Sequence, residues 1–204
     1  LFEQLTVTQV VLIAGNHDYL KKDSYYRTFV WPKHVHILLE KELTKVDLPK
    51  LDVSVYGFSY HSKEIKEIFQ AKAHSSDDCT TRILLLHGGD ENHVPLQKDR
   101  LLSLDYDYIA LGHIHKPRVI SANRIAYCGA LEPIDKNDTG EHGYILGEII
   151  GKECKTEFIV NAGREYKHIE VPVSPDMTSL ALKEKIREQM EKEGIQNIYK
   201  IILT

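Results

Sequence analysis

Residues 108–115 read YIALGHIH, an apolar run that ends in a glycine followed by two histidines. An unbroken apolar run of this length is typical of a strand that is buried on both faces of an α/β sheet. Two other segments share the pattern, since 10–18 read VVLIAGNHD and 82–89 read RILLLHGG. The three segments together predict an α/β fold in which several strands end at polar turns.

The segments between and after these runs indicate further elements. Residues 53–58 predict another strand, and Ser62 caps a predicted helix that extends to Ala73. Four shorter strands with few helices between them are expected at 118–120, 124–127, 143–150 and 154–160. Their spacing predicts hairpins and a second, more antiparallel sheet.

The pattern changes near Gly163, where a separate β-α-β unit begins. It consists of an alternating strand at 166–173, an amphipathic helix at 178–193 that stops at Gly194, and a strand at 198–203. A unit of about forty residues buries too little apolar surface to be stable by itself. We therefore predict one domain over 1–162 and the start of a second domain over 163–204.

Composition excludes several classes of protein. The chain has 204 residues, 26 basic and 30 acidic side chains and a net charge of −4, so net charge gives no support to nucleic-acid binding. No apolar run reaches the roughly 18 residues of a membrane span. Three scattered cysteines favour free thiols in a reducing compartment, which predicts a cytoplasmic protein. Because the chain begins at Leu1 and soon enters a strand, we expect further residues upstream.

The polar residues that end the three apolar runs are the candidate site. Open α/β sheets bind ligands beyond the carboxyl ends of their strands, so these side chains are expected to meet. Imidazole is the commonest metal ligand, and a neutral amide oxygen suits a hard cation. Spacing alone leaves two interpretations open, a metal site and a set of ordinary polar turns. The side chains concerned are Asn16, His17, His87, His113 and His115.

The order and separation of these turns resemble the last three signature blocks of the calcineurin-like metallophosphoesterases. The blocks here are GNHD at 15–18, HG at 87–88 and GHIH at 112–115. Within that superfamily the chain is most similar to the SbcD/YhaO-type bacterial DNA repair exonucleases. That further resemblance lies in ALGHIHKP at 110–117, YCGALEP at 127–133 and GEHGY at 140–144.

The resemblance implies an α/β/α sandwich, of which this chain holds the C-terminal part, followed by the start of a small α+β capping domain. It implies two divalent ions, most often Mn²⁺, about 3.5–4 Å apart, that act together on an in-line displacement. One ion would be held by Asn16, His87 and His113, and the other by His115 with ligands from two earlier blocks. Those earlier blocks, Asp-x-His and Gly-Asp-x-x-Asp, do not occur in this chain.

The resemblance also assigns catalytic roles next to the ligands. His17 matches the histidine that donates a proton to the leaving alkoxide, and Asp18 would orient it. Because the bridging carboxylate is absent, we expect the 204 residues alone to have weak metal affinity and little activity. After His87, the loop residues Asp90, Glu91 and His93 could line the mouth of the site, although a solvated polar loop is the simpler interpretation.

Substrate and partners follow only from the family. The expected function is metal-dependent phosphodiester hydrolysis by a DNA repair exonuclease, with DNA as substrate, an SbcC-like ATPase as partner, a homodimer as the assembly and no membrane association. Two alternatives remain open. One is a phosphoesterase that acts on small nucleotides or phosphoproteins, and the other is a catalytically incomplete binding fragment.

Overall fold

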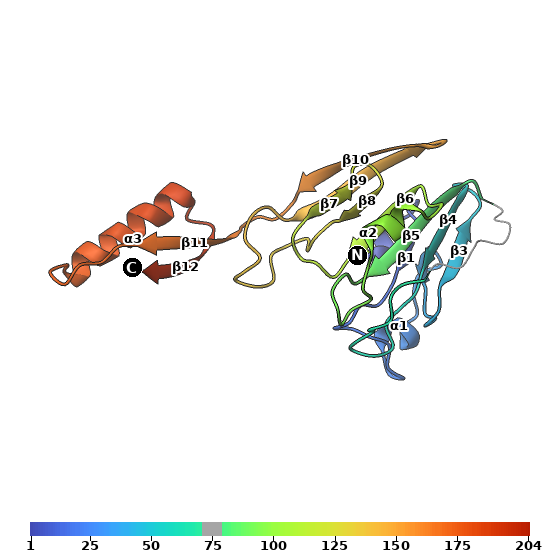
Figure 1. The fold of residues 1–204 in the computed structure, drawn as a ribbon, viewed down its shortest axis with the longest axis horizontal. Helices are drawn as coiled ribbons and strands as arrows, with labels where there is room; N and C mark the ends of the chain where they lie inside the picture. Colours follow the sequence, from blue (N-terminus) through green and yellow to red (C-terminus); the bar gives the residue numbers. More distant parts are fainter. Residues whose placement is uncertain (71–78) are drawn as a thin grey trace. The chain divides into compact units, whose positions relative to one another are not determined.

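The computed structural model describes residues 1–70 and 79–204 and shows a mixed α/β protein with few helices. Its centre is a six-stranded mixed sheet with the strand order β3-β4-β5-β6-β8-β7. Figure 1 shows β3, β4, β5 and β6 side by side in this sheet. The strands are β3 (Thr44–Leu48), β4 (Val53–Gly57), β5 (Thr81–His87), β6 (Tyr108–Gly112), β7 (Arg118–Ser121) and β8 (Ile125–Tyr127).

The parallel strands of this sheet fix the position of the predicted site. β5 runs parallel to both β4 and β6, and β6 runs parallel to β8. In the register of β5 with β6, His87 pairs with Gly112, so both strands end at the same level. β1 (Val10–Leu12) pairs in parallel with β2 (Val35–Ile37) in a separate two-stranded sheet. The expected α/β class with strand ends at polar turns is confirmed.

Large apolar side chains from the sheet and the adjoining loops form the core of this region. Leu84, Ile109 and Ile125, each on a different strand, are fully buried. Tyr106 packs edge-on against Tyr56, with 5.4 Å between ring centroids. The short helices here are η1 (Phe2–Gln4), α1 (Tyr25–Thr28) and α2 (Lys98–Leu102).

The helix predicted from Ser62 to Ala73 is wrong over its described part, and Ala73 itself lies outside the described residues. The backbone of Ile65 instead pairs with the loop after β5, because Ile65 N–H donates to Asn92 O and Val94 N–H donates to Ile65 O. Phe69 stacks on Phe58. Tertiary pairing thus overrides an apolar spacing that suits a helix.

The predicted second sheet is only partly correct. Strands β7 and β8 extend the central sheet, because β8 pairs with β6. The remaining two strands, β9 (Gly143–Ile150) and β10 (Glu153–Val160), form a separate two-stranded sheet. A hairpin spacing therefore identified the strands, but it could not show which neighbour each strand would join.

The chain divides into two compact units. The first contains Leu1–Ile114, Arg118–Tyr127 and Gly147–Glu157, and the second contains His115–Pro117, Cys128–Leu146 and Phe158–Thr204. The second unit includes the predicted β-α-β segment, in which β11 (Tyr166–Val171) and β12 (Ile198–Leu203) pair in parallel and are connected by α3 (Ser179–Glu193). The domain boundary at 162/163 remains a prediction.

Local chemistry explains the limits of α3. Thr178 Oγ1 accepts a hydrogen bond from Ala181 N–H at 3.2 Å, which caps the first turn. Gly194 ends the helix with φ of 102°, a conformation that favours glycine. Only Ile169 and Val171 are buried apolar residues in this β-α-β segment, which agrees with the small core expected from its length.

The structure describes the three cysteines and the helices on which the expectations from composition depend. Cys79, Cys128 and Cys154 are free thiols. Among the described residues, no helix is both long and apolar enough to cross a membrane.

Candidate metal centre

Three of the predicted ligands lie together beyond the strand ends of the first unit. Asn16 is buried in the turn after β1, His87 is the last residue of β5, and His113 directly follows β6. His87 Nε2–H donates to Asn16 Oδ1 at 2.8 Å, and the ring centroids of His87 and His113 are 5.3 Å apart. The structure thus brings Asn16, His87 and His113 together, as the strand pattern predicted.

Two glycines leave just enough room for the His87 ring. A Cβ on Gly15 would lie 2.6 Å from His87 Cε1, and a Cβ on Gly112 would lie 3.0 Å from His87 Nδ1. His113 has φ of 93°, in the left-handed region that a non-glycine residue rarely adopts. Strained backbone of this kind concentrates at functional sites, so its occurrence at a predicted ligand supports the assignment.

The surroundings of His87 keep its ring neutral. Burial, and to a smaller extent the nearby His113, lower the pKa of His87 to about 4. Because metals bind the neutral imidazole, this ring needs no deprotonation to become a ligand near neutral pH. The turn around it is fixed by two buried phenols, since Tyr60 Oη–H donates to His87 O at 2.8 Å and Tyr127 Oη–H donates to Gly88 O at 3.0 Å.

Asp90, which the sequence placed only at the mouth of the site, contacts a predicted ligand directly. Its Oδ2 accepts a hydrogen bond from His113 Nε2–H at 2.7 Å. Its Oδ1 accepts from the backbone N–H groups of Asn92 and His93 at 2.9 and 3.0 Å. His93 Nδ1 lies 2.8 Å from the same oxygen. Although desolvation raises the pKa of Asp90, these hydrogen bonds, first that of His113, bring it well below its ordinary value.

His115 belongs to the second unit, where a different carboxylate holds it. His115 Nδ1–H donates to Asp138 Oδ2 at 2.9 Å, and the same oxygen accepts the backbone N–H groups of Asp135 and Ile134. Desolvation raises the pKa of Asp138, but the hydrogen bonds, led by that of His115, lower it overall. No sequence motif indicated Asp138, because only the fold brings it next to His115. The ligand role of His115 stays a prediction.

The predicted proton donor and its partner lie on the turn after Asn16. His17 is exposed. Both oxygens of Asp18 accept hydrogen bonds from other groups, Oδ1 from Gly15 N–H at 2.7 Å and Oδ2 from Tyr26 Oη–H. Asp18 therefore stabilises the turn that presents Asn16 and His17, and its predicted role in orienting the His17 ring stays a prediction.

Most other histidines have ordinary partners. The rings of His34, His61, His142 and His168 each lie within hydrogen-bonding distance of a backbone carbonyl, and His36 bonds to Gln9. His74 lies outside the described residues.

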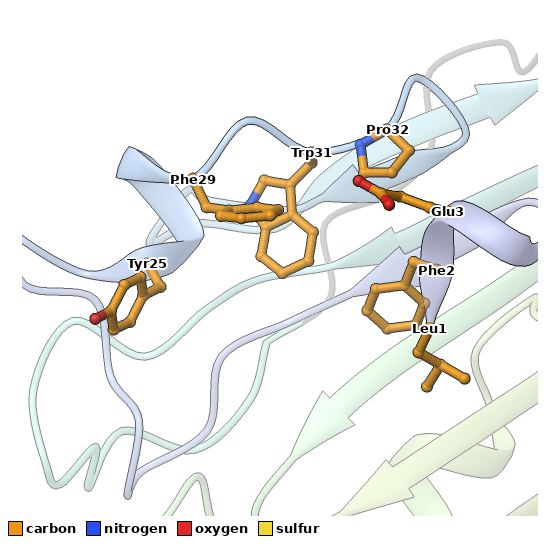
Figure 2. Close-up of a pocket in the computed structure, with 7 residues that line it drawn as sticks. All are labelled: Leu1, Phe2, Glu3, Tyr25, Phe29, Trp31 and Pro32. Atoms are coloured by element: carbon orange, nitrogen blue, oxygen red, sulfur yellow. The ribbon is translucent and has the colours of Figure 1, made fainter.

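An apolar pocket of about 540 Å³ forms a separate feature of the first unit. Trp31 lies at its centre, with its ring centroid 5.0 Å from that of Phe29 and 6.0 Å from that of Phe2 (Figure 2). The pocket contains none of the predicted metal ligands. Its lining residues are Leu1, Phe2, Glu3, Tyr25, Phe29, Trp31 and Pro32.

The donor chemistry of the strand-end cluster fits a divalent cation. One amide oxygen and two imidazoles, one of them kept neutral by burial, form the ligand set that the family pattern assigns to one ion. A second donor group fits as well, because ligand atoms of Asp90, His93 and His113 all lie within 4.8 Å of one another. His113 belongs to both groups.

Comparison with known proteins agrees with this chemistry. Over 208 aligned residues the chain is 30% identical to the uncharacterized metallophosphoesterase YhaO of Bacillus subtilis (strain 168), a match that covers 95% of the chain and 50% of YhaO. It is 28% identical over 160 residues to the DNA double-strand break repair protein Mre11 of Methanocaldococcus jannaschii, which covers 71% of the chain and 43% of that protein. No protein-family model matches.

The mixed α/β fold and the donor groups at the strand ends agree with those of a metallophosphoesterase. With these relatives, the chain belongs to the calcineurin-like metallophosphoesterases. The chain spans about half the length of the curated relatives it matches.

Proposed function

We propose that the complete protein is a Mn²⁺-dependent phosphodiesterase that acts on DNA as an SbcD-like repair exonuclease. The observation that supports it most is the meeting of Asn16, His87 and His113 beyond three strand ends, in the order of the family blocks. In this proposal Asn16, His87 and His113 hold one ion, and His115 contributes to the other. When bound, two divalent ions would stabilise the charge that develops on the phosphoryl oxygens.

The protein's own groups would supply the remaining chemistry. His17 is exposed on the turn that also carries Asn16, so it can approach a substrate that contacts the site. We assign it the proton that passes to the leaving alkoxide. Asp18 holds the backbone of this turn by accepting from Gly15 N–H, and the same turn carries both Asn16 and His17.

Two observations favour DNA as the substrate over a small phosphoester. The relative Mre11 is named for DNA double-strand break repair. In addition, the β11-α3-β12 segment follows the sheet as the capping domain of an SbcD-like enzyme would. An SbcC-like ATPase partner and a homodimer belong to the same proposal.

The direct test is a cleavage assay of the complete protein on single-stranded and duplex DNA in Mn²⁺, beside a mononucleotide and a phosphopeptide. We expect release of nucleotides from DNA that stops with a chelator. Turnover of the mononucleotide or phosphopeptide alone would contradict the DNA assignment but keep the phosphoesterase. In a parallel assay, we expect the 204-residue chain to show little cleavage of bis-p-nitrophenyl phosphate, because it lacks the bridging carboxylate.

A further inference from the structure

The two histidines of the GHIH turn are each held by a carboxylate, but through opposite ring nitrogens. Asp90 accepts from Nε2 of His113 at 2.7 Å, and Asp138 accepts from Nδ1 of His115 at 2.9 Å. An ionised carboxylate can only accept hydrogen bonds, so the bonded nitrogen in each ring must carry the proton. In the neutral ring the other nitrogen then has a free lone pair.

We propose that Asp90 and Asp138 are positioning residues that set opposite tautomers in the two histidines, so that His113 presents Nδ1 and His115 presents Nε2 to metal. This rests on the proposed function insofar as both rings are ligands. A metal-bound histidine commonly donates its other ring N–H to a carboxylate, which fixes the orientation of the ring and raises its basicity.

Both carboxylates are themselves held in place, as a positioning role requires. Oδ1 of Asp90 accepts from the backbone N–H groups of Asn92 and His93, while Oδ2 accepts from His113 Nε2–H at 2.7 Å and lies 2.9 Å from His93 Nδ1. In Asp138 a single oxygen, Oδ2, accepts from His115 and from the backbone of Ile134 and Asp135. Asp90 therefore uses both oxygens as acceptors, whereas Asp138 uses one oxygen for all three donors. Because of this difference, the same substitution to asparagine should affect the two histidines differently.

Replacement of each aspartate by asparagine should have opposite effects. In Asp90→Asn, the amide oxygen should stay on the two backbone N–H groups, so the NH₂ group faces His113 Nε2. Because an NH₂ group can only donate, His113 Nε2 must accept a hydrogen bond from it, which moves the His113 proton to Nδ1. In Asp138→Asn, one amide oxygen can replace Oδ2 for all three donors, so His115 should keep its proton on Nδ1. Asp138→Ala removes the acceptor and should release the His115 ring.

The test is a long-range ¹H–¹⁵N spectrum of the imidazole rings in the metal-free 204-residue chain at about pH 8, where neutral imidazole is the ordinary form. We expect an Nε2–H ring for His113 and an Nδ1–H ring for His115. Asp90→Asn should change His113, and also His93, which contacts the same carboxylate, but not His115. Asp138→Ala should change His115 but not His113, so each variant is the control for the other. The same tautomer in both histidines, or no change of His113 in Asp90→Asn, would overturn the proposal. Because no metal is present, these outcomes do not depend on hydrolytic function.

A second measurement follows metal affinity by calorimetry with Mn²⁺ in the complete protein. Loss of an orienting carboxylate typically lowers metal affinity about 10–100-fold, and we expect this for Asp90→Asn. Glu91→Gln, which neutralises the adjacent exposed carboxylate, should leave the affinity unchanged. Loss of Mn²⁺ in Asp90→Asn together with full retention in His87→Ala would place the ion on Asp90, His93 and His113 and overturn the positioning role. If Mn²⁺ does not bind the parent at all while the tautomers are as expected, the proposed function fails and the carboxylate contacts stand.

Discussion

In the Asp90–His113 and Asp138–His115 pairs a carboxylate accepts a hydrogen bond from a histidine ring, but the two pairs differ in which partner is buried. In the first unit the imidazole of His113 is 14% exposed and the carboxylate of Asp90 is 44% exposed. In the second unit the imidazole of His115 is 40% exposed and the carboxylate of Asp138 is 12% exposed. The predicted ligand is the more buried member of the first pair, and its carboxylate partner is the more buried member of the second. Removal of the carboxylate should therefore affect mainly the ligand in the first unit and mainly the fold in the second.

The largest expected effect separates proton donation from metal binding in the first unit. In the complete protein, His17→Ala should keep its metal content and lose about 10²–10⁴-fold in rate, the usual contribution of a general acid. His87→Ala should lower metal content and rate together, because it removes a half-buried predicted ligand. Metal analysis and phosphodiester cleavage are measured on both variants. If His17→Ala also loses metal, then His17 is a ligand and the first unit holds a different site.

The next effect concerns the tight packing around His87. Gly15→Ala places a Cβ 2.6 Å from the His87 ring, so the ring or the turn must move. Such overpacking costs about 1–3 kcal/mol of unfolding free energy. The shift can be followed by urea titration with fluorescence of Trp31, the single tryptophan, which lies in the first unit. Gly163→Ala in the second unit is the control, because an added Cβ has no atom within 4 Å, and its effect should stay within about 0.5 kcal/mol. If both substitutions changed the free energy of unfolding equally, tight packing around Gly15 would not explain the effect.

Much of the fold was visible in the sequence because the signals were local. Apolar runs between polar turns identified β5, β6, β9 and β12, and Thr178 and Gly194 marked the limits of α3. The helix from Ser62 was wrong because the backbone of Ile65 pairs with a loop that is distant in sequence. Short strands such as β2 and β3 were missed, since three to five residues carry little periodicity.

The same difference between local signals and contacts distant in sequence explains which residues of the candidate site could be predicted. Asn16, His87 and His113 could be predicted because each follows a recognisable strand, and parallel strands end together. Asp138 could not be predicted, because a loop without a motif brings it to His115. Asp90 was visible only as a polar loop residue, since its contact with His113 depends on the turn formed by its own bonds to Asn92 and His93.

An effect of similar size tests the opposite burial of the two carboxylates directly. Asp138→Ala removes the buried carboxylate that accepts the part-buried hydrogen bonds from the backbone N–H groups of Ile134 and Asp135, which costs about 1–3 kcal/mol. We expect faster amide hydrogen exchange at these two residues, and slower exchange again in Asp138→Asn, which restores an acceptor. The expectation is wrong if the alanine variant exchanges as slowly as the parent.

The smallest effect is the stability change on removal of Asp90. Its carboxylate is more exposed, and water can replace it at the N–H groups of Asn92 and His93, so Asp90→Ala should cost only about 0.5–1.5 kcal/mol. Amide hydrogen exchange at Asn92 and His93 in Asp90→Ala is compared with exchange at Ile134 and Asp135 in Asp138→Ala. The comparison ranks the two losses of local stability. A larger loss for Asp90→Ala would reverse the roles assigned to the two carboxylates.

The most direct measurement of the metal site is a crystal structure of the complete protein grown with Mn²⁺, with anomalous diffraction recorded at the manganese edge. We predict an anomalous peak bonded to Asn16 Oδ1, to a ring nitrogen of His87 and to His113 Nδ1, with Asp90 still accepting from His113 Nε2–H. A peak bonded to Asp90, His93 and His113 Nε2, or no peak near Asn16 and His87, would contradict the metal centre described here.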